Sequence, residues 1–188
     1  RACRKLIILI TGAGEALKGL SQGTLTAQET RQLSTSLRYA KHADPMLGII
    51  SAYLYNGIGD VENIRRMCYF YKQNNQDVPF DIALLAGVPL RAAGNGAFHI
   101  QVPEVKETPP AERAPNAPDF VWRGTPALSS SVAGVTPVLR AGWQYLHNSE
   151  YAIHKACLPL TDYLTDAPVS TFFGDAVGRA LVDAFRRL

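Results

Sequence analysis

A glycine-containing turn near the start of the sequence has residues suited to binding a phosphate group. Thr11-Gly12-Ala13-Gly14 follows the apolar run Leu6–Ile10, which has the composition of a buried β-strand. Glycines at such a turn let the backbone approach the pyrophosphate of a dinucleotide at a helix N-terminus. The third glycine of that motif is needed at position 17, where the sequence has Leu17, and residues 26–87 look helical where a second parallel strand is required. We interpret the segment as a strand-to-helix turn; nucleotide binding is an alternative that requires a parallel sheet of at least three strands.

Four residues of metal-ligating types lie close together in the last third of the sequence: His147, Glu150, His154 and Cys157. On one continuous helix they would share a face, and imidazole, carboxylate and thiolate groups are the usual ligands of zinc. Asn148-Ser149 favours the end of a helix at this point, which would separate the four side chains. Their spacing also belongs to no established zinc class. We therefore expect neither a metal site nor a cofactor.

Groups for nucleophilic catalysis are present without a recognisable arrangement. Ser129-Ser130-Ser131 lacks the Gly-x-Ser-x-Gly turn of hydrolases, and no histidine or aspartate is tied to it by a known motif. Cys157 and His154 are close in sequence, whereas a catalytic cysteine and histidine normally come from distant segments. We interpret the three serines as small hydroxyl residues in a loop. The alternative, a hydrolase, predicts a pocket in which His99, His147 or His154 reaches a cysteine or serine.

The charge balance and the cysteines exclude several classes of protein. The 188 residues carry 19 Lys+Arg and 16 Asp+Glu, and this net charge of +3 is too small to indicate nucleic acid or anionic lipid. The longest apolar run, Leu6–Ile10, is far shorter than the ~20 residues that span a bilayer. Three cysteines without CxxC spacing favour a reducing compartment, and we expect a cytoplasmic protein. The sequence starts without Met and enters the apolar run directly, so we expect it to be a piece of a longer protein.

Four closely spaced helix starts organise residues 24–87. Each start has an N-capping side chain or a proline at the first helical position: Thr26 with Glu29, Asp44 with Pro45, Asp60, and Pro79. We expect the first of these helices to end near Ala43. The last one should end at Gly87. The second helix, Pro45 to about Ile58, is apolar nearly all round, which predicts a central position. Connections this short force neighbouring helices to pack antiparallel, so the pattern predicts an antiparallel four-helix bundle.

The second half of the chain has a different composition. Residues 97–102 alternate between apolar and polar side chains as a strand does. Residues 103–126 contain six of the chain's 12 prolines, which predicts an extended crossover rather than helix or sheet interior. In residues 127–188, Thr136-Pro137 predicts a helix start, and Phe172–Leu188 predicts a final helix with Phe173 on its apolar face. The predicted fold is a single α+β domain, mainly α: an antiparallel helical bundle with a minor β component and a Pro-rich crossover.

Aromatic and basic side chains on the second and third predicted helices are suited to contacts with another protein. The aromatic residues there cover more than one face, so some must lie near the surface. Long cations beside aromatic rings favour protein–protein contacts. The predicted partner-binding surface consists of Tyr55, Arg65, Arg66, Tyr69 and Lys72.

Four sequence segments carry a resemblance: Asp44–Tyr55, Ile58–Asp60, Asn63–Met67 and Pro79–Leu85. Together they resemble a helical region of large multidomain bacterial proteins, some of which have a caspase-like or trypsin-like peptidase domain elsewhere in the chain. None of the matching positions belongs to a peptidase active site. The resemblance, which covers roughly residues 40–87, therefore implies an accessory domain without catalytic residues of its own.

These observations predict a non-catalytic scaffold, regulatory or protein-recognition domain of a larger, peptidase-associated bacterial protein. Its partner would be another protein or an upstream domain of the same polypeptide, with neither nucleic acid nor membrane as a ligand. The alternative is a fragment of a cysteine or serine peptidase whose remaining catalytic groups lie outside this chain.

Overall fold

The computed structural model describes residues 13, 14, 16, 18, 19, 22–94, 97–147 and 158–186. The predicted strand Leu6–Ile10 and the potential ligands Glu150, His154 and Cys157 lie outside these residues. Asn148-Ser149, where the sequence favours the end of a helix, also lies outside them.

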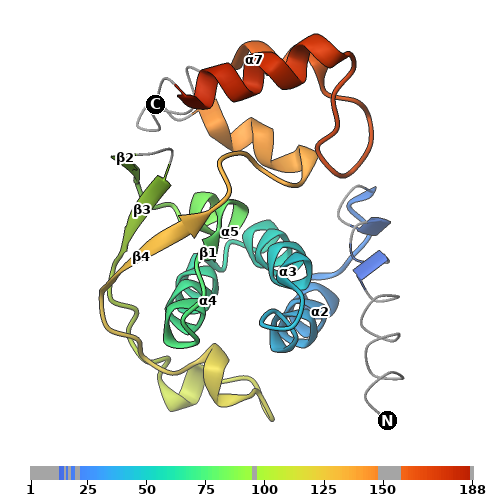
Figure 1. Ribbon diagram of the computed structural model, residues 1–188. Helices are drawn as coiled ribbons and strands as arrows, with labels where there is room; N and C mark the ends of the chain where they lie inside the picture. Colours follow the sequence, from blue (N-terminus) through green and yellow to red (C-terminus); the bar gives the residue numbers. More distant parts are fainter. Residues whose placement is uncertain are drawn as a thin grey trace.

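Four helices follow one another close to the predicted positions: α2 (Ala27–Tyr39), α3 (Pro45–Gly57), α4 (Val61–Gln73) and α5 (Phe80–Leu85) (Figure 1). The capping box is confirmed, because the backbone N–H groups of Thr26 and Glu29 each donate to the other's side chain, at 2.9 and 3.3 Å. Asp44 and Asp60 accept backbone hydrogen bonds at the starts of α3 and α4, as predicted. The first helix is shorter than expected and ends at Tyr39 rather than near Ala43.

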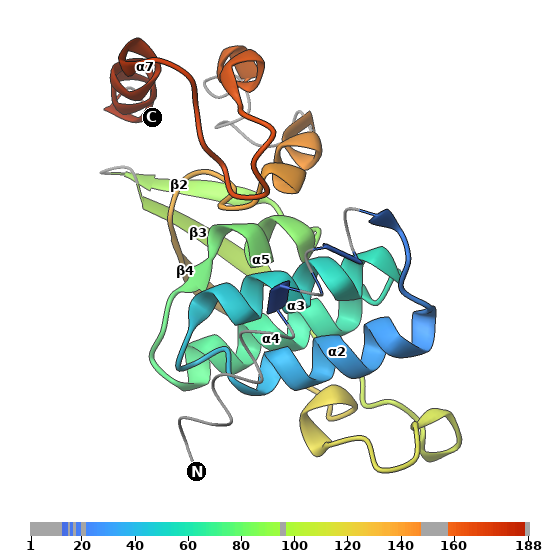
Figure 2. The same cartoon turned by 90° about the vertical axis from the view of Figure 1, so that its right-hand side faces the viewer.

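Helix α3 lies at the centre, as its apolar composition predicts. All residues from Leu47 to Tyr55 are buried. Figures 1 and 2 show α2 on one side of α3, with α4 and α5 on the other. Gly87, in the left-handed conformation with a φ of +63°, turns the chain away from the end of α5.

A small mixed sheet covers the far side of α4 and α5. Its strands are β1 (Val78–Pro79), β2 (Leu90–Gly94), β3 (Ala97–Val102) and β4 (Leu128–Ala133), in the order β1-β4-β3-β2. β1 pairs with β4 in parallel, whereas the β4–β3 and β3–β2 pairs are antiparallel. The inner face buries Phe98, Ile100 and Val132 against the helices. The described strands therefore do not form the three-stranded parallel sheet that nucleotide binding would require.

The three serines form the middle of β4 rather than a loop, so that interpretation was wrong. Ser129, Ser130 and Ser131 pair with β3 residues Gln101, Ile100 and His99. Ser130 faces the core and satisfies its hydroxyl group by donating to the Ser131 carbonyl at 3.2 Å. The partner strand β3 lies far away in sequence, and its pairing overrides the weak strand preference of serine.

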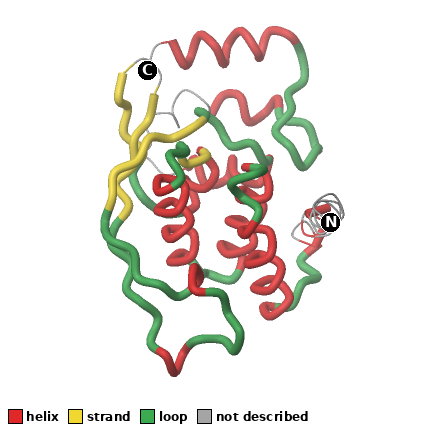
Figure 3. Tube along the Cα trace, turned by 60° about the horizontal axis from the view of Figure 1, so that its bottom comes forward, coloured by secondary structure: helices red, strands yellow, loops and turns green. Residues whose placement is uncertain are grey.

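The proline-rich crossover, residues 103–126, is extended, as predicted, and we call it the strap. It contains two short 3-10 turns, η1 (Pro110–Glu112) and η2 (Asp119–Val121). Its two ends are joined by a backbone bridge between Val105 and Thr125, with N···O distances of 2.9 and 2.8 Å. Figure 3 shows the strap as a long loop that leaves the sheet and passes beneath the helices.

The C-terminal part is helical but differs in detail from the prediction. It contains the 3-10 helices η3 (Arg140–His147) and η4 (Leu158–Tyr163) and the helix α7 (Asp175–Arg186), which lies beside η4 (Figure 1). Thr136-Pro137 does not start a helix. The last helix begins after Gly174, whose φ is +88°, and it leaves Phe173 70% exposed rather than on an apolar helix face.

The described elements thus make up a mainly helical α+β fold with a minor mixed sheet, in agreement with the predicted class. Among the described residues, no helix has the length and apolar character that a bilayer span requires.

Candidate functional site

A cleft of about 1120 Å³ separates α2 and the start of α4 from the strap. We call it the strap cleft. Figure 2 shows the strap (yellow) running alongside α2 (blue). On the helical side, five residues of α2 line it: Gln28, Arg31, Gln32, Thr35 and Ser36. Their spacing of three and four residues places them on one helix face over about 12 Å. The strap cleft is therefore elongated along the axis of α2.

The buried Arg66 on α4 attaches both ends of the strap to the helices. Its side chain is 1% exposed. Nε donates to the carbonyl of Arg123 at 2.9 Å, and Nη2 donates to the carbonyl of Lys106 at 2.8 Å. Glu62, one turn earlier, lies 3.5 Å from Nη2 and forms an ion pair with it. The guanidinium group thus donates hydrogen bonds to strap carbonyl groups that are not paired within a helix or a sheet.

A second buried arginine, Arg38 on α2, attaches the strap at η2. Its Nη2 donates to the carbonyl of Phe120 and its Nη1 to Oδ1 of Asn63, both at 2.7 Å. The guanidinium carbon lies 4.9 Å from the centroid of the Phe120 ring, within range of a cation–π contact. Its Nε is buried and has no hydrogen-bond partner among the described residues. Burial lowers the pKa of Arg38, although an arginine keeps its charge at any physiological pH.

Lys41, beyond the end of α2, is also buried. Its Nζ lies 5.5 and 5.9 Å from the ring centroids of Phe70 and Tyr71. Burial, with a smaller effect of the Arg38 charge, lowers the pKa of Lys41 to about 8. The neighbouring His42 donates from Nδ1 to Oε1 of Gln76 at 2.6 Å, and burial lowers the pKa of His42 as well. Arg38 and Lys41 place positive charge near the C-terminal end of α2, where the helix dipole is negative.

The surface predicted from the sequence is not continuous. Arg66 and Tyr55 are each 1% exposed, because the strap covers Arg66 and the Tyr55 hydroxyl turns inward to a 3.2 Å hydrogen bond with Thr35. Arg65 and Tyr69 are half-buried and Lys72 is exposed. Arg65 donates from Nε to the carbonyl of Ala86 at 3.0 Å. Arg66 is therefore not available at the surface where it was predicted, since the strap packs over it.

Asp81 on α5 is a buried charged group that the sequence analysis missed. It is 0% exposed and accepts three hydrogen bonds: from the Tyr53 hydroxyl and the Val138 N–H at 2.8 Å and from the Leu139 N–H at 3.2 Å. Burial raises the pKa of Asp81 in spite of these donors, and burial together with the carboxylate raises the pKa of Tyr53. An acidic residue inside the apolar run Phe80–Leu85 is the signal that could have revealed it.

The sheet's outer face brings together the groups named for the hydrolase alternative. His99 and Ser131 are directly opposite on β3 and β4, and the Ser131 hydroxyl donates to the carboxylate of Asp77. A serine nucleophile requires the opposite arrangement, in which its hydroxyl donates to histidine and the aspartate orients that histidine. No hydrogen bond joins His99 to Ser131 in the described part of the chain, and neither residue lines the strap cleft.

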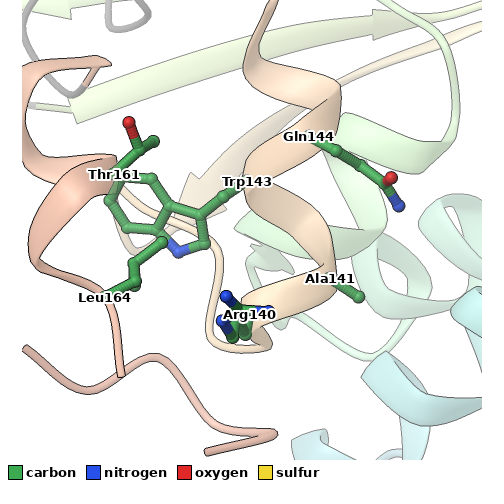
Figure 4. A pocket seen from close by; sticks show the side chains of 6 residues that line it. All are labelled: Arg140, Ala141, Trp143, Gln144, Thr161 and Leu164. Atoms are coloured by element: carbon green, nitrogen blue, oxygen red, sulfur yellow. The ribbon is translucent and has the colours of Figure 1, made fainter. Parts of the chain in front are cut away.

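A smaller cavity of about 300 Å³ lies between η3 and η4, lined by Arg140, Ala141, Trp143, Gln144, Thr161 and Leu164 (Figure 4). The Trp143 ring is buried, and its Nε1 donates to Ser170 at 2.8 Å. Arg140, its charged residue, lies 3.5 Å from Asp166. This cavity lacks a nucleophile beside a base. Within the described residues, no three histidine, cysteine, aspartate or glutamate side chains are grouped closely enough to bind a metal ion.

No family model, no curated protein and no solved structure matches the chain. The geometry of the strap cleft is therefore the basis for any functional conclusion.

Proposed function

We propose that the chain is a non-catalytic protein-recognition domain that binds an extended peptide segment in the strap cleft. The observation that carries the proposal is the elongated cleft itself, with its polar wall on α2. At about 3.3 Å per residue, its 12 Å of helix face matches three to four residues of an extended chain.

The chemistry of the cleft walls suits a peptide backbone. Uncharged amide and hydroxyl side chains line it on three segments: Gln28, Gln32, Thr35, Ser36, Asn63, Thr108 and Asn116. An amide side chain both donates and accepts, which matches the N–H and C=O groups that alternate along an extended chain. Trp122 and Val121 of the strap add apolar surface for side chains of the bound segment.

The helices would supply the scaffold. In this proposal α2 to α5 act as an antiparallel bundle that keeps one wall of the cleft rigid, while the arginine contacts hold the strap as the second wall. From the resemblance over residues 40–87, we further propose that the bound segment belongs to a larger, peptidase-associated bacterial protein in the cytoplasm.

The test is selection of random displayed peptides, followed by calorimetric titration of the synthetic peptides. Gln32→Trp fills the middle of the cleft from an exposed helix position and should abolish binding of the selected peptides. Gln73→Trp is the matched control, because Gln73 is also an exposed helical glutamine but lies outside the cleft. Both variants should melt within a few degrees of the wild type. Peptides that bind equally to both variants would contradict the proposal.

A further inference from the structure

Two charged residues of the strap cleft have no partner in the described structure. Arg31 on α2 and Glu112 on the strap line opposite walls, and neither side chain has an ion pair or hydrogen bond among the described residues. Both are exposed. Each is therefore available to a charged group of a bound segment.

The other charged residues of the cleft are already engaged. Asp60 uses both carboxylate oxygens to accept from the backbone and side chain of Asn63, at 3.1 and 2.8 Å. Arg66 donates to strap carbonyls and lies beside Glu62.

Arg113 is engaged in the same way on the strap. It pairs with Glu107 and stacks on the Trp122 ring, with 3.8 Å between the guanidinium carbon and the ring centroid. Its Nε donates to the Thr108 carbonyl at 2.9 Å. The free charge of the cleft is thus positive on the α2 wall and negative on the strap wall.

We propose that the strap cleft selects an extended segment that carries one acidic and one basic side chain an odd number of residues apart. This inference rests on the proposed peptide-recognition function. Successive side chains of an extended chain point in opposite directions. An odd separation therefore directs the acidic group to Arg31 and the basic group to Glu112, whereas an even separation directs both to the same wall. Two acidic or two basic groups at odd separation place one of them against a like charge.

The cleft is also a favourable setting for this selection. Most of its other polar lining groups are uncharged amides and hydroxyl groups, so the exposed charges of Arg31 and Glu112 set its charge preference, with the energies of surface ion pairs. We expect each pair to change the dissociation constant of a peptide about fivefold.

Random 12-residue peptides displayed on phage, selected in parallel on four proteins, test the inference. The proteins are the wild type, Arg31→Glu, the cleft-filling Gln32→Trp, and Arg91→Glu as a charge-reversal control on the exposed outer face of the sheet. Wild-type and Arg91→Glu selections should be enriched in acidic–basic pairs at separations of one or three residues. Arg31→Glu makes both walls negative and should instead enrich basic–basic pairs at the same separations.

The possible results separate this inference from the proposed function. One result would overturn the proposed charge and spacing preference but leave peptide recognition supported. In it, the selected peptides fail to bind Gln32→Trp, and so need an open cleft, but show no preference for charge or spacing. A selection in which no peptide depends on Gln32 would overturn both. A synthetic wild-type peptide should bind Arg31→Glu about fivefold more weakly, and unchanged binding would also refute the charge and spacing preference.

Discussion

The strap and the segment leading into η3 are both irregular, and each is held to the helices by buried charged side chains of opposite sign. Arg66 and Arg38 donate to carbonyl groups of the strap. Asp81 accepts from the amide groups of Val138 and Leu139 ahead of η3. The difference shows that the unpaired backbone groups of an irregular segment determine the sign of the buried charge. Unpaired carbonyl groups need a cationic donor, and unpaired amide groups need an anionic acceptor.

The two attachments also differ in how well their charges are compensated. Asp81 receives three donors, so each part of its carboxylate is satisfied. Arg66 has the exposed Glu62 nearby, whereas Arg38 has a buried Nε without a partner in the described residues. The strap attachment is therefore the less complete of the two, and we expect the strap to open before the η3 contact breaks.

Removing Asp81 should have the largest effect. Asp81→Ala leaves the Tyr53 hydroxyl and two backbone amides buried without an acceptor, which should lower the free energy of unfolding by about 3–5 kcal/mol. Urea denaturation of the variant and the wild type measures this difference. Asp77→Ala is the control, since Asp77 is exposed, and it should cost less than about 1 kcal/mol. Equal effects of the two substitutions would refute the structural role of Asp81.

Removing Arg66 should have a smaller and more local effect. Arg66→Met keeps the apolar stem but leaves strap carbonyls without donors, at a cost of about 2–3 kcal/mol. Because the strap is attached at few points, it should also be cleaved faster by a broad-specificity protease under native conditions. Arg65→Met removes a single hydrogen bond to Ala86 and should cost about 1 kcal/mol without faster strap cleavage. Cleavage at the same rate in both variants would mean that Arg66 does not hold the strap.

The smallest effect should be a pH dependence of the free energy of unfolding that comes from the Asp81 carboxylate. The raised pKa of Asp81 means that the folded state holds this proton to higher pH than the unfolded state does. As pH rises from the ordinary carboxyl value of about 4 through the raised value, the unfolded state loses its proton first, and the free energy of unfolding falls. Subtracting the pH profile of Asp81→Asn from that of the wild type should isolate this fall. Arg66→Met should leave it unchanged, because arginine does not titrate in this range.

The features that the sequence predicted correctly depend on interactions within a few residues. The caps at Thr26, Asp44 and Asp60 each join a side chain to an amide two or three positions ahead, so their residue types and spacing are sufficient evidence. Proline density likewise predicted the extended strap, because each proline excludes regular structure where it stands.

The features that it missed depend on segments far apart in the chain. Arg66 looks like a solvated helix residue until Lys106 and Arg123 are placed over it. Ser130 reads as a loop residue until Ile100 pairs with it in the sheet. The strap cleft was missed for the same reason, since its two walls come from residues 28–36 and 108–122. No local pattern of residue types indicates that these segments meet.

The order of the strands has a consequence for how the chain acquires its structure. Among the described strands, β4 comes last in sequence yet occupies an inner position, between β1 and β3. The β2–β3 pair can form from neighbouring residues, but Val78 meets Val132 only after the whole strap has been synthesised and its ends brought together. Until then one edge of β3 is open to any extended chain nearby. Self-association would compete with folding during this interval, and the rate of strap closure would decide the yield of native protein.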